Sequence, residues 1–110
     1  RIYSVTAMGK QQLCQWIAES EEMAPIKDDL LVKLYAGYLV PNQTIVAKLE
    51  AHRQQHQQRL AIYHEIKRQY FKNPQTLSKT PKFQYMTLLR GIHYETAWLA
   101  WCDEIMPLLK

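Results

Sequence analysis

The stretch from Asn42 to about Phe71 most constrains the fold, because it reads as one long uninterrupted helix. Neither Gly nor Pro occurs in it until Asn73-Pro74, and Asn42 is a suitable N-cap after Pro41. A helix of about thirty residues spans roughly 45 Å, more than a compact domain of this size needs. Such a helix usually has a partner, either a neighbouring helix of the same chain or a second copy of the protein.

One face of this helix carries apolar and aromatic residues and two histidines at heptad-like steps of three and four. Its members are Ile45, Leu49, His52, His56, Leu60, Tyr63, Ile66 and Tyr70. We expect a twin molecule to cover this face in a coiled-coil-like homodimer. Trp98 and Trp101 of the last helix are predicted to join that interface. A long helix in a monomeric bundle is the alternative.

The remaining pattern predicts an all-α domain of about four helices. The other three are expected over Thr6–Glu19, from Asp28 to Pro41, and over Gln84–Leu109, with a loop at Asn73–Phe83. Gly91 is expected to let a facing helix come close. The second helix is expected to bury Leu30, Leu31, Leu34, Tyr35 and Tyr38. Helices one, three and four are expected to pack around Leu13, Trp16, Leu34, Leu60, Ile92 and Leu99.

Composition narrows the class of protein. The 110 residues suffice for one domain with a modest core, and 47% are hydrophobic, so the chain should fold. The net charge of +4 comes from scattered basic residues, which solvated helix faces explain at least as well as nucleic acid does. Cys14 and Cys102 form neither a disulfide framework nor a zinc motif, which favours reduced thiols in a cytoplasm. No membrane span or signal peptide is indicated. The start at Arg1 suggests a fragment of a longer protein.

Candidate chemistry is sparse. His52 and His56 have the spacing of metal ligands on one helix face, but no matching Cys, Asp or Glu completes a site. We interpret them as polar residues that set the register between paired helices, with a pairing that could respond to pH. His64-Glu65-Ile66-Lys67 faintly echoes the phospho-acceptor box of sensor kinases, without its proline. No nucleophile, carboxylate pair or phosphate loop indicates an enzyme, and no cofactor or metal is expected.

Aromatic residues offer a ligand hypothesis beside their usual role in packing. A planar aromatic effector could fit between such side chains, with hydroxyl or imidazole groups orienting its polar end. The residues assigned to this pocket are Trp16, Tyr35, Tyr38 and Tyr94.

Three segments together resemble the PadR family of winged-helix regulators. The first reads Arg1-Ile-Tyr-Ser-Val-Thr-Ala-Met-Gly and is followed by Leu13 and Trp16; the second is Asp28-Asp-Leu-Leu-Val-Lys-Leu. The third, Thr87-Leu-Leu-Arg-Gly-Ile-His-Tyr-Glu with Trp101, is similar to the closing helix of the family. Their order and spacing cover essentially the whole chain and point to the longer PadR subfamily.

This resemblance implies a C-terminal dimerisation and effector domain at residues 7–110, with residues 1–6 as a remnant of the wing strand. Arg1 and Tyr3 would be the wing residues that remain, because the helix-turn-helix is missing. The implied partners are a second subunit, operator DNA through the missing N-terminal domain, and a small aromatic effector. The alternative is a stand-alone helical ligand-binding module or a dimerisation module like that of a sensor kinase.

Overall fold

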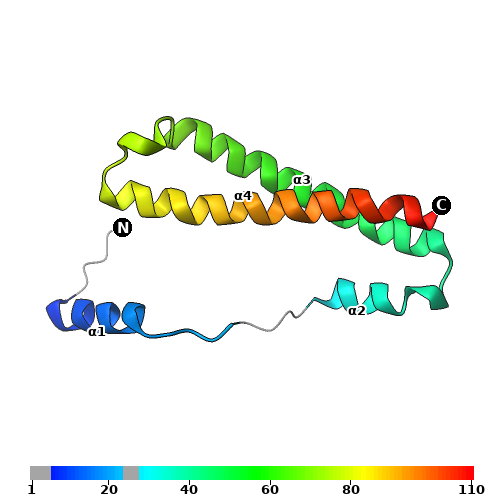
Figure 1. The fold of residues 1–110 in the computed structure, drawn as a ribbon, viewed down its shortest axis with the longest axis horizontal. Helices are drawn as coiled ribbons and strands as arrows, with labels where there is room; N and C mark the ends of the chain where they lie inside the picture. The colour runs from blue at the N-terminus through cyan, green and yellow to red at the C-terminus, as the bar shows by residue number, and fades with distance from the viewer. Residues whose placement is uncertain (1–5, 24–27) are drawn as a thin grey trace.

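Two long antiparallel helices, α3 (Asn42–Tyr70) and α4 (Lys79–Ile105), form a hairpin that dominates the molecule (Figure 1). The computed structural model describes residues 6–23 and 28–110. Three elements precede the hairpin: α1 (Ala7–Ala18), α2 (Asp29–Tyr35) and the 3-10 turn η1 (Gly37–Leu39). A 3-10 turn, η2 (Pro74–Thr76), follows α3, and another, η3 (Met106–Leu109), follows α4. The described residues are all helical or irregular, which confirms the all-α prediction with one long helix. The predicted strand at Arg1–Val5 lies outside them.

The long helix occupies nearly its predicted range, but Asn42 has a different role. Pro41 is the extended residue before the helix, and Asn42 is the first helical residue. The Asn42 side-chain amide donates a hydrogen bond to the backbone carbonyl of Leu109, 3.2 Å away. Asn42 therefore joins the start of α3 to the C-terminal turn η3 instead of capping its own helix.

Helix α4 begins at Lys79, earlier than the predicted Gln84. The backbone N–H of Lys82 donates to the carbonyl of Ser78, which closes the first turn. Pro81 lies inside that turn, where a missing N–H leaves no helical hydrogen bond unmade. Reading Pro81 as a loop residue was wrong for this reason.

The face of α3 that runs from Ile45 to Tyr70 at heptad-like steps, which we call the α3 ridge, packs against α4 of the same chain. Ile45 and Leu49 are buried there with Leu30 and Cys102, and Leu34, Trp98, Trp101 and Ile105 pack around them. His52, His56, Leu60, Tyr63 and Ile66 are half-buried, while Tyr70 is exposed. Helix α4 thus covers the ridge, and Ile45 and Leu49 are not available to a second copy. The expectation that a twin molecule covers Ile45 and Leu49 is corrected accordingly, and for the half-buried and exposed members of the ridge it stays a prediction.

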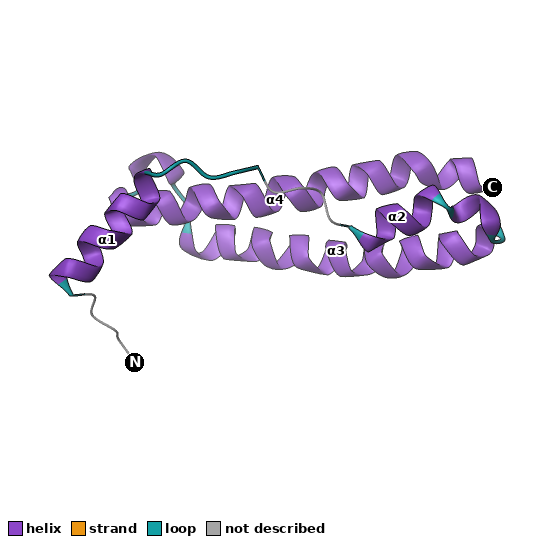
Figure 2. Ribbon diagram, turned by 90° about the horizontal axis from the view of Figure 1, so that it is seen from below, coloured by secondary structure: helices purple, strands orange, loops and turns teal. Residues whose placement is uncertain are grey.

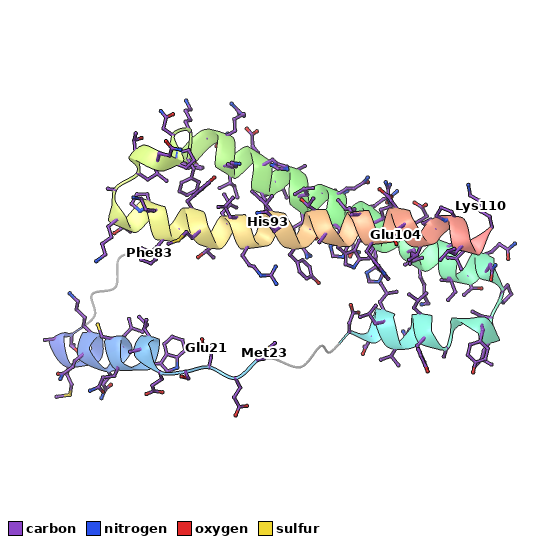
Figure 3. All side chains as sticks on the ribbon, viewed as in Figure 1. Glu21, Met23, Phe83, His93, Glu104 and Lys110 are labelled. Carbon is purple, nitrogen blue, oxygen red and sulfur yellow. The ribbon has the colours of Figure 1, made fainter. Side chains whose placement is uncertain are left out.

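Helix α1 forms as predicted but stays outside the core. The Thr6 hydroxyl accepts a hydrogen bond from the N–H of Gly9, as expected of an N-cap. No residue of α1 is buried, and the helix lies apart from the hairpin in Figure 1, while Figure 2 shows it near the end of the hairpin where α3 and α4 are joined. The prediction that Leu13 and Trp16 join the core is therefore wrong, since Trp16 is 69% exposed. Met23, in the segment after α1, is also exposed (Figure 3).

Helix α2 contributes less to the core than expected. The Asp28 side chain accepts from the N–H of Leu30 and caps the helix. Leu30 is buried and Leu34 half-buried, as predicted. Tyr35 and Tyr38, however, are 89% and 83% exposed, and Leu31 is also exposed. The helix ends at Tyr35, so the two tyrosines do not continue its inward face.

The molecule is extended. Its radius of gyration is 19.5 Å, whereas a compact chain of this length has about 13 Å. Its accessible surface of 9695 Å² compares with roughly 6400 Å² for a compact protein of this mass. In the described residues, no helix is both long and apolar enough to cross a membrane.

Gly91 should not tolerate alanine while Tyr63 faces it. A Cβ atom at Gly91 would lie 2.9 Å from Cε2 of the Tyr63 ring, as the predicted close approach requires. We expect Gly91→Ala to lower the free energy of unfolding, although alanine is favoured over glycine in a helix by about 1 kcal/mol. In a Tyr63→Ala background the same change should stabilise, which urea denaturation of the double-mutant cycle would measure. Destabilisation of equal size in both backgrounds would contradict this packing.

The two thiols should differ sharply in reactivity. Cys14 is exposed and Cys102 is buried, and burial raises the pKa of the Cys102 thiol. Because the thiolate is the reactive species, iodoacetamide should label Cys14 in the native protein and Cys102 only after denaturation. Mass spectrometry of the labelled protein would show this. Native labelling of Cys102 at the rate of Cys14 would contradict the packing of the hairpin.

Candidate functional site

A buried carboxylate lies midway along the hairpin. Glu95 of α4 is only 2% exposed, and both of its oxygens have partners from α3. The ring Nδ1 of His56 contacts Oε1, and Nη1 of Arg59 donates to Oε2 over 3.2 Å. No buried side-chain nitrogen or oxygen among the described residues lacks a hydrogen-bond partner. The carboxylate thus ties two residues of α3 to one position of α4.

Aromatic rings gather around His56, the histidine that contacts Glu95. The His56 ring stacks on Trp98 with centroids 4.0 Å apart, and the Trp98 ring meets Trp101 edge-on at 5.4 Å. His52 lies one turn away, 6.3 Å from Trp98, and the Tyr94 ring is 6.3 Å from His56. We call His52, His56, Arg59, Tyr94, Glu95, Trp98 and Trp101 the hairpin cluster.

The hairpin cluster is built to hold two helices in register. Charge-assisted hydrogen bonds have strict geometry, and a buried charge that loses its partner is costly. Sliding α3 along α4 would separate Glu95 from both His56 and Arg59. The sequence correctly indicated that His52 and His56 are polar residues in a helix seam, but the seam lies within one chain.

The pair formed by Glu95 and Arg59 was not predicted from the sequence. The sequence does show an acidic residue three positions after Ile92 and three before Trp98, which places a carboxylate in the inward stripe of α4. Sequence spacing places Glu95 on that stripe, but only the pairing of the two helices shows which α3 residues meet it.

A second link between the helices lies nearer the C-terminus. Nε of Arg53 donates to Oδ1 of Asp103 over 3.0 Å, and this hydrogen bond raises the pKa of Arg53. Both groups are solvent-accessible, so the pair adds little stability. On the outer side of α3, Glu65 accepts from Arg68 and Gln69, and the hydrogen bond with Arg68 lowers the pKa of Glu65.

The four residues predicted to form an aromatic effector pocket are not brought together in one chain. Trp16 lines a shallow groove at the end of α1, with Ile17, Glu19, Ser20 and Glu21. Tyr35 lines another beside Asp28, Leu31 and Val32. Tyr38 is exposed on η1, and Tyr94 belongs to the hairpin cluster. Arg1 and Tyr3, the predicted wing remnant, lie outside the described residues.

Metal binding has no support in this part of the molecule. Among residues 6–23 and 28–110, no group of three or more His, Cys, Asp or Glu side chains could hold a metal ion. His56 instead directs its Nδ1 to Glu95 and its ring face to Trp98.

Comparisons with known proteins agree on one relationship. A family model described as the virulence activator alpha C-terminal domain matches residues 26–110. The solved structure of the Vibrio cholerae virulence activator AphA matches with 27% sequence identity and a TM-score of 0.86. That match covers 98% of this chain and 64% of the AphA chain. A comparison with curated proteins gave no match.

Replacing Glu95 should weaken the hairpin. Glu95→Gln keeps the volume but removes the charge that Arg59 and His56 meet. Hydrogen bonds to charged groups contribute about 1.5–3 kcal/mol, so we expect the free energy of unfolding to fall by about that amount. Glu104→Gln, at an exposed position of the same helix (Figure 3), is the matched control and should change it by less than about 0.5 kcal/mol. Equal effects in urea denaturation would show that the hairpin cluster does not lock the helices.

Proposed function

The chain belongs to the virulence activator alpha C-terminal family, and from this membership we propose that it is the dimerisation domain of a PadR-type transcription regulator. The observation that carries the proposal is the match over 98% of the chain to a virulence activator. The protein would work by association and not by catalysis.

The apolar surface of α1, which nothing in the described part of the chain buries, supports a second copy of the protein as the partner. Met8, Leu13, Trp16 and Ile17 are apolar and exposed on this one short helix. The accessible surface of 9695 Å² exceeds that of a compact protein of this mass by roughly 3300 Å². A stable interface buries about 800 Å² on each partner, so the excess is ample for a dimer.

The dimer contact we propose differs from the one expected from the sequence. Because α4 already covers the α3 ridge, α1 of one copy would pack on the outer face of the hairpin of the other. On the hairpin, Ile62, Phe83 and Met86 are apolar and exposed within one chain. A charge at Leu49 should then unfold the hairpin, since Leu49 is fully buried, and would not simply separate two folded subunits.

DNA recognition would belong to a different part of the protein. The chain spans 64% of the length of the AphA chain, and we assign operator binding to a winged-helix domain outside these 110 residues. We place this winged helix before α1 in the sequence. If α1 of each subunit packs on the hairpin of the other, the position of each winged helix depends on the partner subunit. An effector would act by binding the two arrangements of the dimer with different affinity.

Removing the apolar anchor of α1 should dissociate the dimer without unfolding the chain. We expect sedimentation velocity at micromolar concentration to give a dimer for the unaltered chain and a monomer for Trp16→Glu. Met23→Glu is the control, since Met23 is 97% exposed and lies outside α1. Circular dichroism should show the same helix content in all three proteins. A monomeric parent chain, or a Trp16→Glu variant that stays dimeric, would contradict the proposal.

A further inference from the structure

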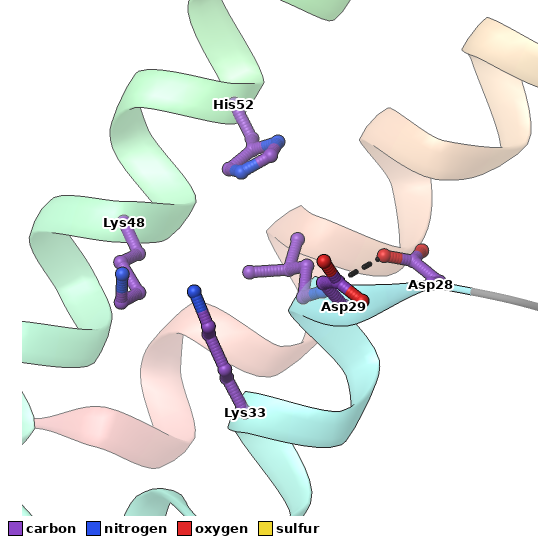
Figure 4. Close-up of a pocket in the computed structure, with 6 residues that line it drawn as sticks. Asp28, Asp29, Lys33, Lys48 and His52 are labelled. Carbon is purple, nitrogen blue, oxygen red and sulfur yellow. Dashed lines mark hydrogen bonds between the residues drawn. The ribbon is translucent and has the colours of Figure 1, made fainter.

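A polar groove separates the start of α2 from the face of α3. It has a volume of about 340 Å³ and is lined by Asp28, Asp29, Leu30, Lys33, Lys48 and His52 (Figure 4). This size is at the lower end for sites that bind small molecules. Among the described residues of the lining, Leu30 is the only apolar one, so this part of the groove does not suit the planar aromatic effector expected from the sequence.

Two lysines from different helices converge on this groove. Lys48 lies on α3, and Lys33 extends from α2 toward it, with His52 one turn farther along α3 (Figure 4). Within the described residues, the ion pairs of the structure involve neither lysine. Two ammonium groups that face one space repel each other, and an anion between them removes that cost. Lysine ammonium groups are also common ligands of phosphate.

The opposite end of the groove is acidic. Oδ1 of Asp28 accepts from the N–H of Leu30 at 2.9 Å, which leaves its second oxygen free of that bond. Asp29 lies beside it in the lining (Figure 4). Ionised carboxylates only accept hydrogen bonds, so they select hydroxyl or amine donors on a ligand. The groove therefore offers donors at one end and acceptors at the other.

We propose that this groove binds a small phosphorylated polyol, such as a sugar monophosphate. Lys33, Lys48 and His52 bind the phosphate group, and Asp28 and Asp29 accept hydrogen bonds from the hydroxyls. A phosphate monoester carries a charge of about −1.5 to −2 at neutral pH. Two ammonium groups match this charge better than they match the single negative charge of a carboxylate ligand. All of these groups belong to one chain, so the proposal does not depend on the dimer.

Binding would join α2 to the hairpin. Lys33 and the two aspartates lie on or next to α2, whereas Lys48 and His52 lie on α3. A ligand that bridges them holds α2 against α3 next to the buried Leu30.

Isothermal titration calorimetry of the full 110-residue chain tests this site, with ribose 5-phosphate as the probe. We expect saturable binding that weakens about tenfold or more in Lys48→Gln, since a hydrogen bond to a charged group contributes more than 1.4 kcal/mol. Lys82→Gln, at an exposed position of α4, is the control and should bind as the parent chain does. Asp29→Asn should weaken ribose 5-phosphate but leave inorganic phosphate unchanged.

Further probes separate the parts of the proposal. Ribose without phosphate should not bind, and inorganic phosphate should bind more weakly than the sugar phosphate. No saturable heat with ribose 5-phosphate, or equal losses in Lys48→Gln and Lys82→Gln, would overturn the site. The proposed ligand class would be wrong if inorganic phosphate bound as tightly as ribose 5-phosphate, because the hydroxyls would then contribute nothing. It would also be wrong if ribonate, a sugar acid with a carboxylate in place of the phosphate, bound more tightly. None of these results bears on dimer formation, which sedimentation measures separately.

Discussion

The burial of the α3 ridge against α4 is the interaction on which the rest of the structure depends. Leu49 is fully buried there, and Ile45 and Cys102 are buried with it. Helix α2 is attached to this hairpin through Leu30, and η3 returns to α3 through the Asn42–Leu109 hydrogen bond. Apolar burial stabilises the hairpin, since each fully buried side chain of this size contributes about 1.5–3 kcal/mol.

Apolar packing alone does not fix the register of two long helices, because a shift by one heptad again places apolar residues face to face. The hairpin cluster removes this freedom. Glu95 has its hydrogen-bond partners only when His56 and Arg59 lie opposite it, and a buried carboxylate without partners is costly. We infer that fixing the register of the two helices is the reason for a charged residue in the inward stripe of α4.

Helix periodicity and capping rules predicted much of the fold from the sequence, including Thr6 as N-cap, the range of the long helix and the close approach at Gly91. They could not tell which neighbour covers the α3 ridge, because a helix of the same chain and one of a twin molecule satisfy the same spacing. Periodicity also placed Trp16 in the core, since a stripe shows that a face is apolar and not that something covers it. The groove at Lys33 and Lys48 combines two helices whose approach is a tertiary feature.

We propose that one chain completes the hairpin, whereas α1 needs a second copy of the protein to cover its apolar face. Amide hydrogen exchange at a series of protein concentrations, read by mass spectrometry, tests both halves together. We expect the protection of α3 and α4 to stay constant on dilution below the dimer dissociation constant, while the protection of α1 is lost. Loss of protection in α3 and α4 in step with α1 would mean that the hairpin depends on a partner subunit, contrary to the fold described above.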